Sequence, residues 1–351
     1  MLVLGIESSC DETAAAVVEG SRVRSSVVAT QHDLHAEYGG VVPEIASRAH
    51  EGHILPVLRR AVRDAGIELK DLDAIAVGHR PGLVGSLLIG LSAAKALSWS
   101  LGVPLVGVDH VHAHLYAAAL DSDPIDFPAL GLVVSGGHTT LYAMESETGL
   151  RRLGGTIDDA AGEAYDKVAA ILGLGHPGGP LVDQLACEPG ADEHAFDFPI
   201  GLMKKDNLDF SFSGVKTSVL YAVRGRPNPP KMPGKDPIVL PPPPPMTEQR
   251  TRDIAASFQR AVCAALLRKA EAAFERHGPF RTLIVGGGVS ANSRLRREMD
   301  ELGARLGVPV RIPPMKYCVD NAAMIAGLGA VMFARGHRDD LTLNAVPTTA
   351  C

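Results

Sequence analysis

Residues 2–18, LVLGIESSCDETAAAVV, decide the fold of this chain. Two apolar runs, LVLGI and AAAVV, flank the polar segment 7–13, and this pattern predicts two strands joined by a tight connection. The pattern returns at residues 130–143, where two apolar runs flank the small polar turn 135–139, SGGHT. Two copies of one hairpin in the two halves of the chain indicate a duplicated domain.

Further strand and helix patterns alternate around these hairpins. Strands are predicted at 73–77, 105–108 and 282–285, and helices near 46–65, 84–100, 160–172, 251–276 and 290–303. Such alternation is typical of α/β layering. We expect one lobe over residues 1–110 and a second over 111–319. A C-terminal helix at about 320–351 is expected to fold back on the first lobe.

The composition limits the partners and the compartment. The chain has 351 residues, of which 46% are hydrophobic, and a net charge of −6. Because phosphate binding normally needs a basic face, an RNA substrate would require help from another protein. No apolar run approaches the roughly 18 residues of a membrane span, and no basic leader opens the chain. We therefore expect a cytoplasmic protein that does not contact membranes.

The five cysteines are scattered and odd in number, which predicts reduced thiols rather than a disulfide framework or a zinc site. Residues 224–249 form a proline-rich insertion that cannot form a helix or a central strand. We expect an exposed extended or disordered loop there, and deletion of residues 227–245 should leave folding and catalysis nearly intact.

His110 and His114 are four residues apart in a segment with helical composition. This spacing puts both imidazoles on one helix face, about 40° apart, which suits metal binding. His112 falls about 200° from His110 and should point elsewhere. Asp11, Glu12 and Asp320 are the acidic candidates to complete a site. A zinc peptidase would need Glu at position 111, and Val111 makes that class improbable.

Glycine turns suggest a nucleotide site. The segment 286–288 is a triple glycine between a strand and a helix, where a ligand could approach the backbone at the positive end of that helix. Tight packing is the alternative explanation. The turns 8–10 and 135–137 would offer amide and hydroxyl donors to phosphates from two sides. Asp158 or Asp159 should cap the helix that follows, whereas Asp166 in its third turn needs another explanation.

Nine stretches in one order resemble a single family. They are GIESSCDETAAAVV (5–18), YGGVVPEIASRAH (38–50), PGLVGSLLIG (81–90), LVVSGGHTTL (132–141), TIDDAAGEAYDKVA (156–169), HPGGP (176–180), DFSFSGVKT (209–217), GGGVSANSRLR (286–296) and DNAAMIA (320–326). The chain is similar to the TsaD/YgjD family of tRNA threonylcarbamoyladenosine-forming transferases, once mislabelled as endopeptidases. The resemblance spans nearly the whole chain.

The resemblance implies an actin/sugar-kinase/Hsp70-like (ASKHA) fold, with two duplicated RNase-H-like lobes around a nucleotide cleft. It implies a divalent metal, with iron favoured and zinc possible, held by His110, His114 and Asp320. It links Asp11 and Glu12 to catalysis. The residues that it implies for the adenylate are Ser135, Gly136, Gly137, His138, Thr139, Asp166, Gly179, Asp183 and Asn292.

The resemblance also implies the reaction: transfer of threonylcarbamoyl from threonylcarbamoyl-AMP to N6 of the tRNA adenosine just 3′ of the anticodon. TsaB-like and TsaE-like partner proteins are implied as well. An ASKHA kinase or ATPase without an RNA substrate is the alternative, although it has no need of the histidine pair. This chain departs from the family pattern at Arg80, where Gly is common, and at Asp109 and His112 beside the first metal histidine.

Overall fold

Two five-stranded sheets with the same topology form the framework of the protein. The computed structural model describes residues 1–38, 40–202, 207–228 and 242–348. The first sheet contains β1 (Leu2–Glu7), β2 (Glu12–Glu19), β3 (Arg22–Thr30), β4 (Ala74–Arg80) and β5 (Leu105–Asp109), in the order β3-β2-β1-β4-β5. In this sheet β1 runs antiparallel to β2 and parallel to β4, and β4 runs parallel to β5.

The second sheet repeats this arrangement. It contains β6 (Ala129–Val134), β7 (Thr139–Met144), β8 (Leu150–Gly155), β9 (Thr282–Gly286) and β10 (Val310–Arg311), in the order β10-β9-β6-β7-β8. The strand β6 runs antiparallel to β7 and parallel to β9, as β1 does to β2 and β4. The duplication predicted from the two hairpins is therefore confirmed strand by strand.

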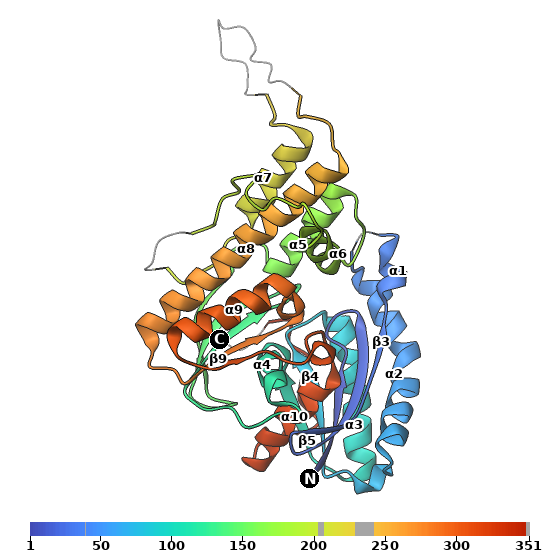
Figure 1. The fold of residues 1–351 in the computed structure, drawn as a ribbon. Helices are drawn as coiled ribbons and strands as arrows, with labels where there is room; N and C mark the ends of the chain where they lie inside the picture. Colours follow the sequence, from blue (N-terminus) through green and yellow to red (C-terminus); the bar gives the residue numbers. More distant parts are fainter. Residues whose placement is uncertain (39, 203–206, 229–241, 349–351) are drawn as a thin grey trace, which may run out of the picture.

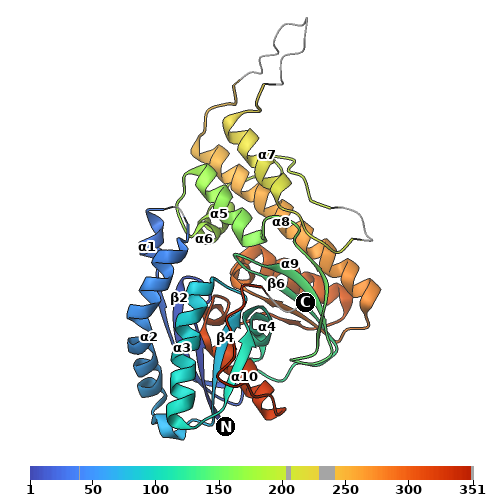
Figure 2. The same ribbon diagram turned by 180° about the vertical axis from the view of Figure 1, so that it is seen from behind.

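Helices cover both faces of the first sheet. On one face, α2 (Pro43–Ala65) and α3 (Val84–Leu101) bury a cluster that includes Leu4, Ile6 and Leu91. On the other face lies α10 (Ala322–Ala334), the apolar helix near the C-terminus. Figure 1 shows the short α1 (His32–Ala36) above α2, and Figure 2 shows α2 and α3 side by side.

The helix α4 (His110–Tyr116) lies between the two sheets. It contacts α10 on one side and the strands β6 and β9 on the other. The outer face of the second sheet shares one hydrophobic core with a group of helices, most of which lie in the upper part of the molecule in Figure 1. These are α5 (Ala161–Leu172), α6 (Gly178–Ala186), α7 (Ser213–Arg224), α8 (Glu248–His277) and α9 (Ser293–Leu306). Short 3-10 turns occupy Leu69–Asp71, Ala117–Ala119, Gly288–Ala291 and Met315–Tyr317.

Several sequence expectations need correction. The C-terminal helix ends at Ala334, and the chain beyond it runs extended beside β5, where Asp339 N donates to Leu105 O. The proline-rich stretch is shorter than 224–249, because α7 reaches Arg224 and α8 begins at Glu248. Of that stretch, residues 229–241 lie outside the described residues.

Neither Asp158 nor Asp159 caps α5. The N-cap position is Ala160, whose N–H donates to Glu163. Asp158 instead accepts from the backbone of Phe212 and Ser213 at the start of α7, and Asp159 pairs with Lys167 and Lys216. The acidic pair therefore ties the turn before α5 to the start of α7.

One helix, α3, is long and apolar enough to bear on the expectation about membranes. By length and composition alone, α3 is able to cross a membrane, although a buried core helix passes the same test. In this structure Leu87, Leu91 and Ala94 of α3 are buried in the protein interior. The helix is therefore at least partly a core helix of the first lobe.

Candidate metal centre and adenylate site

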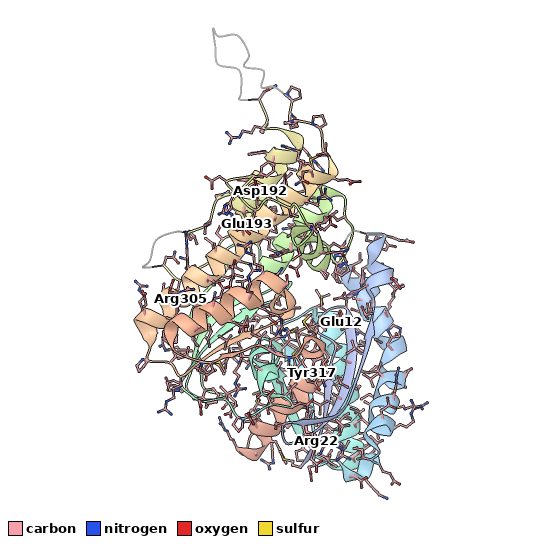
Figure 3. The ribbon with its side chains drawn as sticks, viewed as in Figure 1. Glu12, Arg22, Asp192, Glu193, Arg305 and Tyr317 are labelled. Carbon is pink, nitrogen blue, oxygen red and sulfur yellow. The ribbon has the colours of Figure 1, made fainter. Side chains whose placement is uncertain are left out.

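The parallel strands of the first sheet bring the candidate residues together. Because β1, β4 and β5 run in the same direction, their carboxyl ends lie at one edge of the sheet. The turn after β1 ends with Asp11, β2 opens with Glu12, and α4 starts directly after β5 with His110. In Figure 3 Glu12 lies at the end of the first lobe that faces the upper helices, and Arg22 lies at the opposite end.

His110, His114 and Asp320 form the candidate metal centre. Their ligand atoms all lie within 4.8 Å of one another. Asp320 Oδ1 is 3.4 Å from His110 Nε2 and 3.1 Å from His114 Nε2. His112, by contrast, packs edge-on against Tyr142, with ring centroids 5.5 Å apart. Asp320 is more than 200 residues from the histidines in the sequence, and it comes close to them because α10 packs against α4.

The chemistry of these three residues fits a divalent cation. His114 is fully buried, its Nδ1 has no hydrogen-bond partner among the described residues, and its Nε2 faces Asp320 Oδ1 at 3.1 Å. Buried polar groups normally have partners, and an imidazole nitrogen facing a second imidazole and a carboxylate suits a metal ion. Two imidazoles and one carboxylate are also the donor set of many catalytic metal sites.

Burial and neighbouring charges both shift the pKa values of these three groups in the metal-free protein. Burial lowers the pKa of His110, but the Asp320 and Glu7 carboxylates outweigh it and hold that pKa well above its usual range. Burial lowers the pKa of His114, and the neighbouring His110 charge adds to this effect. Burial raises the pKa of Asp320, but both histidines outweigh it and keep that pKa well below its usual value.

Asp11 and Glu12 form a second polar cluster with His32 of α1. His32 Nε2 is 3.2 Å from Glu12 Oε1 and 3.8 Å from Asp11 Oδ2. Burial raises the pKa of Glu12 to about 8, opposed by the hydrogen bond from His32 and increased by the charges of Asp320 and Asp11. Burial likewise raises the pKa of the Cys10 thiol, so Cys10 stays protonated and is a poor nucleophile.

The turn 135–139 of the second lobe is compact and open on its outer side. Ser135 N donates to His138 O at 2.8 Å, and His138 N donates to Ser135 Oγ at 3.1 Å. Gly136 and Gly137 are exposed, and a Cβ on either would meet no atom within 4 Å. Thr139 Oγ1 accepts from Ala161 N at 2.9 Å, which fixes the start of α5 against the turn.

His138 connects this turn to the metal centre. Burial, followed by the positive charges of His110 and His114, lowers the pKa of His138 to about 4. Its ring is therefore neutral at neutral pH. The strand β9 also joins the two regions, because Gly286 lies against the carbonyl oxygen of His114 and Gly287 against Ser135. The turn 135–139 therefore lies beside the helix that carries both histidines.

The other predicted adenylate residues lie on α5, α6 and the start of α9. Asp166 Oδ1 accepts from Gly178 N at 2.8 Å, and the neighbouring Gly179 has open space where a Cβ would be. Asp183 accepts from Ser293 N at 3.0 Å and from Ser293 Oγ at 2.8 Å. Asn292 caps α9, since its Oδ1 accepts from Leu295 N at 2.9 Å. Asp166, Asp183 and Asn292 therefore each have a structural contact, and nucleotide contact stays a prediction for all four residues.

The triple glycine serves packing more than ligand approach. A Cβ on Gly286 would overlap the carbonyl oxygen of His114, and one on Gly287 would overlap the carbonyl oxygen of Val134. Gly287 also has a φ of 94°, which favours glycine. Only Gly288 has open space beside it. The first glycine thus lets β9 approach the helix that carries both histidines.

Sequence reasoning missed three residues that hold the site together. Glu7 Oε2 lies 3.0 Å from His110 Nδ1, and His32 contacts Glu12 and lies close to Asp11. Gln259 of α8 donates to Asp183 at 3.0 Å and accepts from Asn292 at 2.8 Å. The sequence offered a signal only for Glu7, an ionisable residue at the end of an apolar strand. His32 and Gln259 reach the site only through tertiary packing.

Comparison with known proteins shows the family of this chain. The family model for TsaD, tRNA N6-adenosine threonylcarbamoyltransferase, matches residues 22–327. The chain belongs to this family. The transferase of Symbiobacterium thermophilum is 50% identical over 347 residues, covering 99% of this chain and 96% of the relative. The transferase of Trichlorobacter lovleyi is 48% identical over 349 residues, covering 99% and 96% respectively.

More distant solved structures share the fold. Full-length HypF, in its phosphate- and nucleotide-bound form, matches with a TM-score of 0.56 and 13% identity, covering 94% of this chain and 46% of HypF. Component A of the (R)-2-hydroxyglutaryl-CoA dehydratase of Acidaminococcus fermentans matches with a TM-score of 0.51 and 14% identity, covering 95% and 97%. These likenesses, with the two equivalent sheets, identify a duplicated two-lobed α/β fold of the ASKHA type.

Proposed function

We propose that this member of the transferase family moves the threonylcarbamoyl group of threonylcarbamoyl-AMP to N6 of adenosine 37 in tRNAs that read codons starting with A. The observation that carries the proposal is the convergence of His110, His114 and Asp320 beside the open turn 135–139. A group that activates a carbonyl and a surface that accepts a phosphate are thus adjacent, as acyl transfer from an adenylate requires.

The acceptor amine sets the catalytic problem. Its lone pair is delocalised into the purine, so the enzyme must activate the carbonyl, orient the amine, or both. His110, His114 and Asp320 would hold a divalent cation, which supplies Lewis acidity toward a substrate oxygen when bound. The turn 135–139, with Asp166, Gly179, Asp183 and Asn292, would bind and orient the adenylate.

In the transfer step, the adenosine N6 nitrogen attacks the carbamoyl carbon and a C–N bond forms. The bond between that carbon and the phosphate oxygen breaks, and AMP leaves with the electron pair. We assign the amine proton to the pair Asp11 and Glu12. A pKa of about 8 for Glu12 supports this role, since proton transfer is most effective when the pKa lies near the working pH.

Iron is our proposal for the cation, with zinc as the second choice, because both accept imidazole and carboxylate ligands. The net charge of −6 supports a need for partner proteins in tRNA binding, and we propose TsaB-like and TsaE-like partners. The outer side of α3 is a candidate contact surface, because Trp99 is 77% exposed and Leu88 is 48% exposed. We propose a cytoplasmic location, where tRNA is the available substrate.

Mass spectrometry of nucleosides tests the proposal. Unmodified tRNA is incubated with threonylcarbamoyl-AMP, the metal-loaded protein and its partners, then digested and analysed for threonylcarbamoyladenosine. We expect the modified nucleoside with the wild-type protein and none with His110→Ala. A kinase or ATPase would consume ATP and leave the tRNA unmodified, and that result would overturn the proposed function.

A further inference from the structure

Glu7 is a buried acid that the proposed mechanism does not use. It is the last residue of β1 and has no exposed surface. Its Oε1 accepts from Ser9 N at 2.6 Å, and its Oε2 lies 3.0 Å from His110 Nδ1. A carboxylate without access to water is costly unless its oxygens are hydrogen-bonded, and here both are.

This contact determines which nitrogen of His110 carries a proton. A carboxylate oxygen only accepts, so the ring must donate its Nδ1–H to Glu7 Oε2. Loss of the other ring proton then leaves the Nε2 lone pair on the side of the ring that faces Asp320 Oδ1, 3.4 Å away. Such a carboxylate–histidine contact fixes the ring orientation of a metal ligand and makes it a stronger donor.

The two histidines of the metal centre differ in the contacts of their Nδ1 atoms. His114 Nδ1 has no hydrogen-bond partner in the part of the chain that the structure describes. His110 Nδ1 faces Glu7 and also lies 3.3 Å from Ser9 Oγ. The orientation of His110 is therefore held by the first hairpin, and that of His114 by the packing around it.

The neighbouring strand leaves room for the acid. A Cβ on Gly78 of β4 would lie 2.6 Å from Glu7 Oε2. Any side chain at that position would force the carboxylate away from His110. Gly78 thus offers a way to disturb the contact without altering Glu7 itself.

We propose that Glu7 is a positioning residue that orients His110 and strengthens it as a ligand. The inference rests on the proposed function only in taking His110, His114 and Asp320 as the metal site. In Glu7→Gln, an amide NH₂ must face either Ser9 N–H or His110 Nδ1. If it faces His110, the ring is driven toward the tautomer with its proton on Nε2, which is the wrong nitrogen for binding.

The experiment measures zinc affinity by competition with a chromophoric chelator, on full-length protein. We expect Glu7→Gln to weaken zinc binding by about 10–100-fold, the usual cost of losing such a partner. Gly78→Ala should weaken it in the same direction. Glu19→Gln is the matched control, because Glu19 is a half-exposed strand-end glutamate that pairs with Arg24 and should leave affinity unchanged.

A spectroscopic readout distinguishes orientation from general stability. In zinc-loaded wild-type protein, ¹⁵N NMR of the histidine rings should show His110 protonated at Nδ1 and metal-bound at Nε2. The opposite assignment would overturn the inference without any variant. Wild-type affinity in both folded Glu7→Gln and Gly78→Ala would overturn it too. Retention of zinc by His110→Ala would instead mean that the proposed metal site itself is wrong.

Discussion

The two hairpin turns occupy equivalent positions in equivalent sheets but differ in chemistry. The turn between β1 and β2 is acidic and mostly buried, with Glu7 at 0% and Asp11 at 8% exposure. The turn between β6 and β7 is built from small residues, and its two glycines are exposed. The duplicated scaffold thus carries a buried acidic turn between β1 and β2, called the closed turn below, and an exposed glycine turn between β6 and β7, called the open turn.

Burial explains why the two turns suit different tasks. Carboxylates in a low-dielectric setting have shifted pKa values and strong interactions with cations, which suits proton transfer and support of a metal ligand. A turn with free backbone amides and no side chains in the way suits an anionic phosphate. The duplication explains why the two turns share one scaffold, and the residues in each turn determine which of the two proposed roles it suits.

The largest effect is expected from substitution of the metal ligands, and it should be absent for the neighbouring His112. His110→Ala and Asp320→Ala should each lose bound metal and abolish transfer, because each removes one of only three protein ligands. His112→Ala should keep its metal, since that ring packs on Tyr142. Metal analysis of the purified variants measures this. Equal loss in all three would show that the helix face is wrongly assigned.

A side chain on the open turn should affect the adenylate and leave the metal alone. Gly137→Val places atoms where the structure has open space, so folding should be unchanged. We expect adenylate binding to weaken at least about tenfold, or about 1.4 kcal/mol, because the phosphate could no longer approach the amides. Calorimetric titration with a non-hydrolysable analogue measures it. Gly52→Val on α2, also without near neighbours, is the control for an added side chain.

The closed turn should give the folding stability of the protein a distinct pH dependence through Glu12. The pKa of Glu12 is raised from 4.5 to about 8, so the folded state binds its proton more tightly than the unfolded state does. Stability contributed by that proton is lost as pH rises from about 4.5 to about 8. Glu12→Gln should therefore be more stable than wild type at pH 9, by a few times the ~1.4 kcal/mol of one pKa unit, and similar at pH 4.

Chemical denaturation at both pH values measures the difference. The protein must be stripped of metal with a chelator, because a nearby cation would itself favour the carboxylate. A constant difference across the pH range would show that Glu12 is not shifted. The open turn supplies a control, since Gly137→Val should follow the wild-type pH dependence.

The smallest expected effect is on stability, and it concerns the contact between Arg80 and Asp109 at the start of α4. Asp109 caps that helix through Oδ1, and its Oδ2 lies 3.4 Å from Arg80 Nε. Both residues are departures from the family pattern. Because Arg80 is 35% exposed, we expect a modest coupling of about 1 kcal/mol in a double-mutant cycle of Arg80→Met and Asp109→Asn. Thermal denaturation measures it, and additive effects would mean that the two residues act independently.

Periodicity predicted most of the elements that frame the site, but not all. The strands around both turns and the helices α2, α3, α5, α8 and α9 lie within a few residues of their predicted bounds. The strands β3 and β8 and the helices α6 and α7 were not predicted, although the segments of α6 and α7 appear among the family motifs. The helix α6 opens with two glycines and a proline, and β8 ends in two glycines, which are weak helix and strand formers.

By itself, the sequence determined the duplication, the spacing of His110 and His114, and through the nine motifs the family. These are local properties or patterns carried along the chain, so no folded coordinates are needed to find them. The family resemblance named Asp320, but only the tertiary structure shows that Asp320 lies beside the histidines, that Glu7 contacts one of them, and that Gly286 makes room for their helix. Those contacts join residues about 100 or more apart in the sequence, and such contacts depend on how helices and sheets pack, which no local pattern encodes.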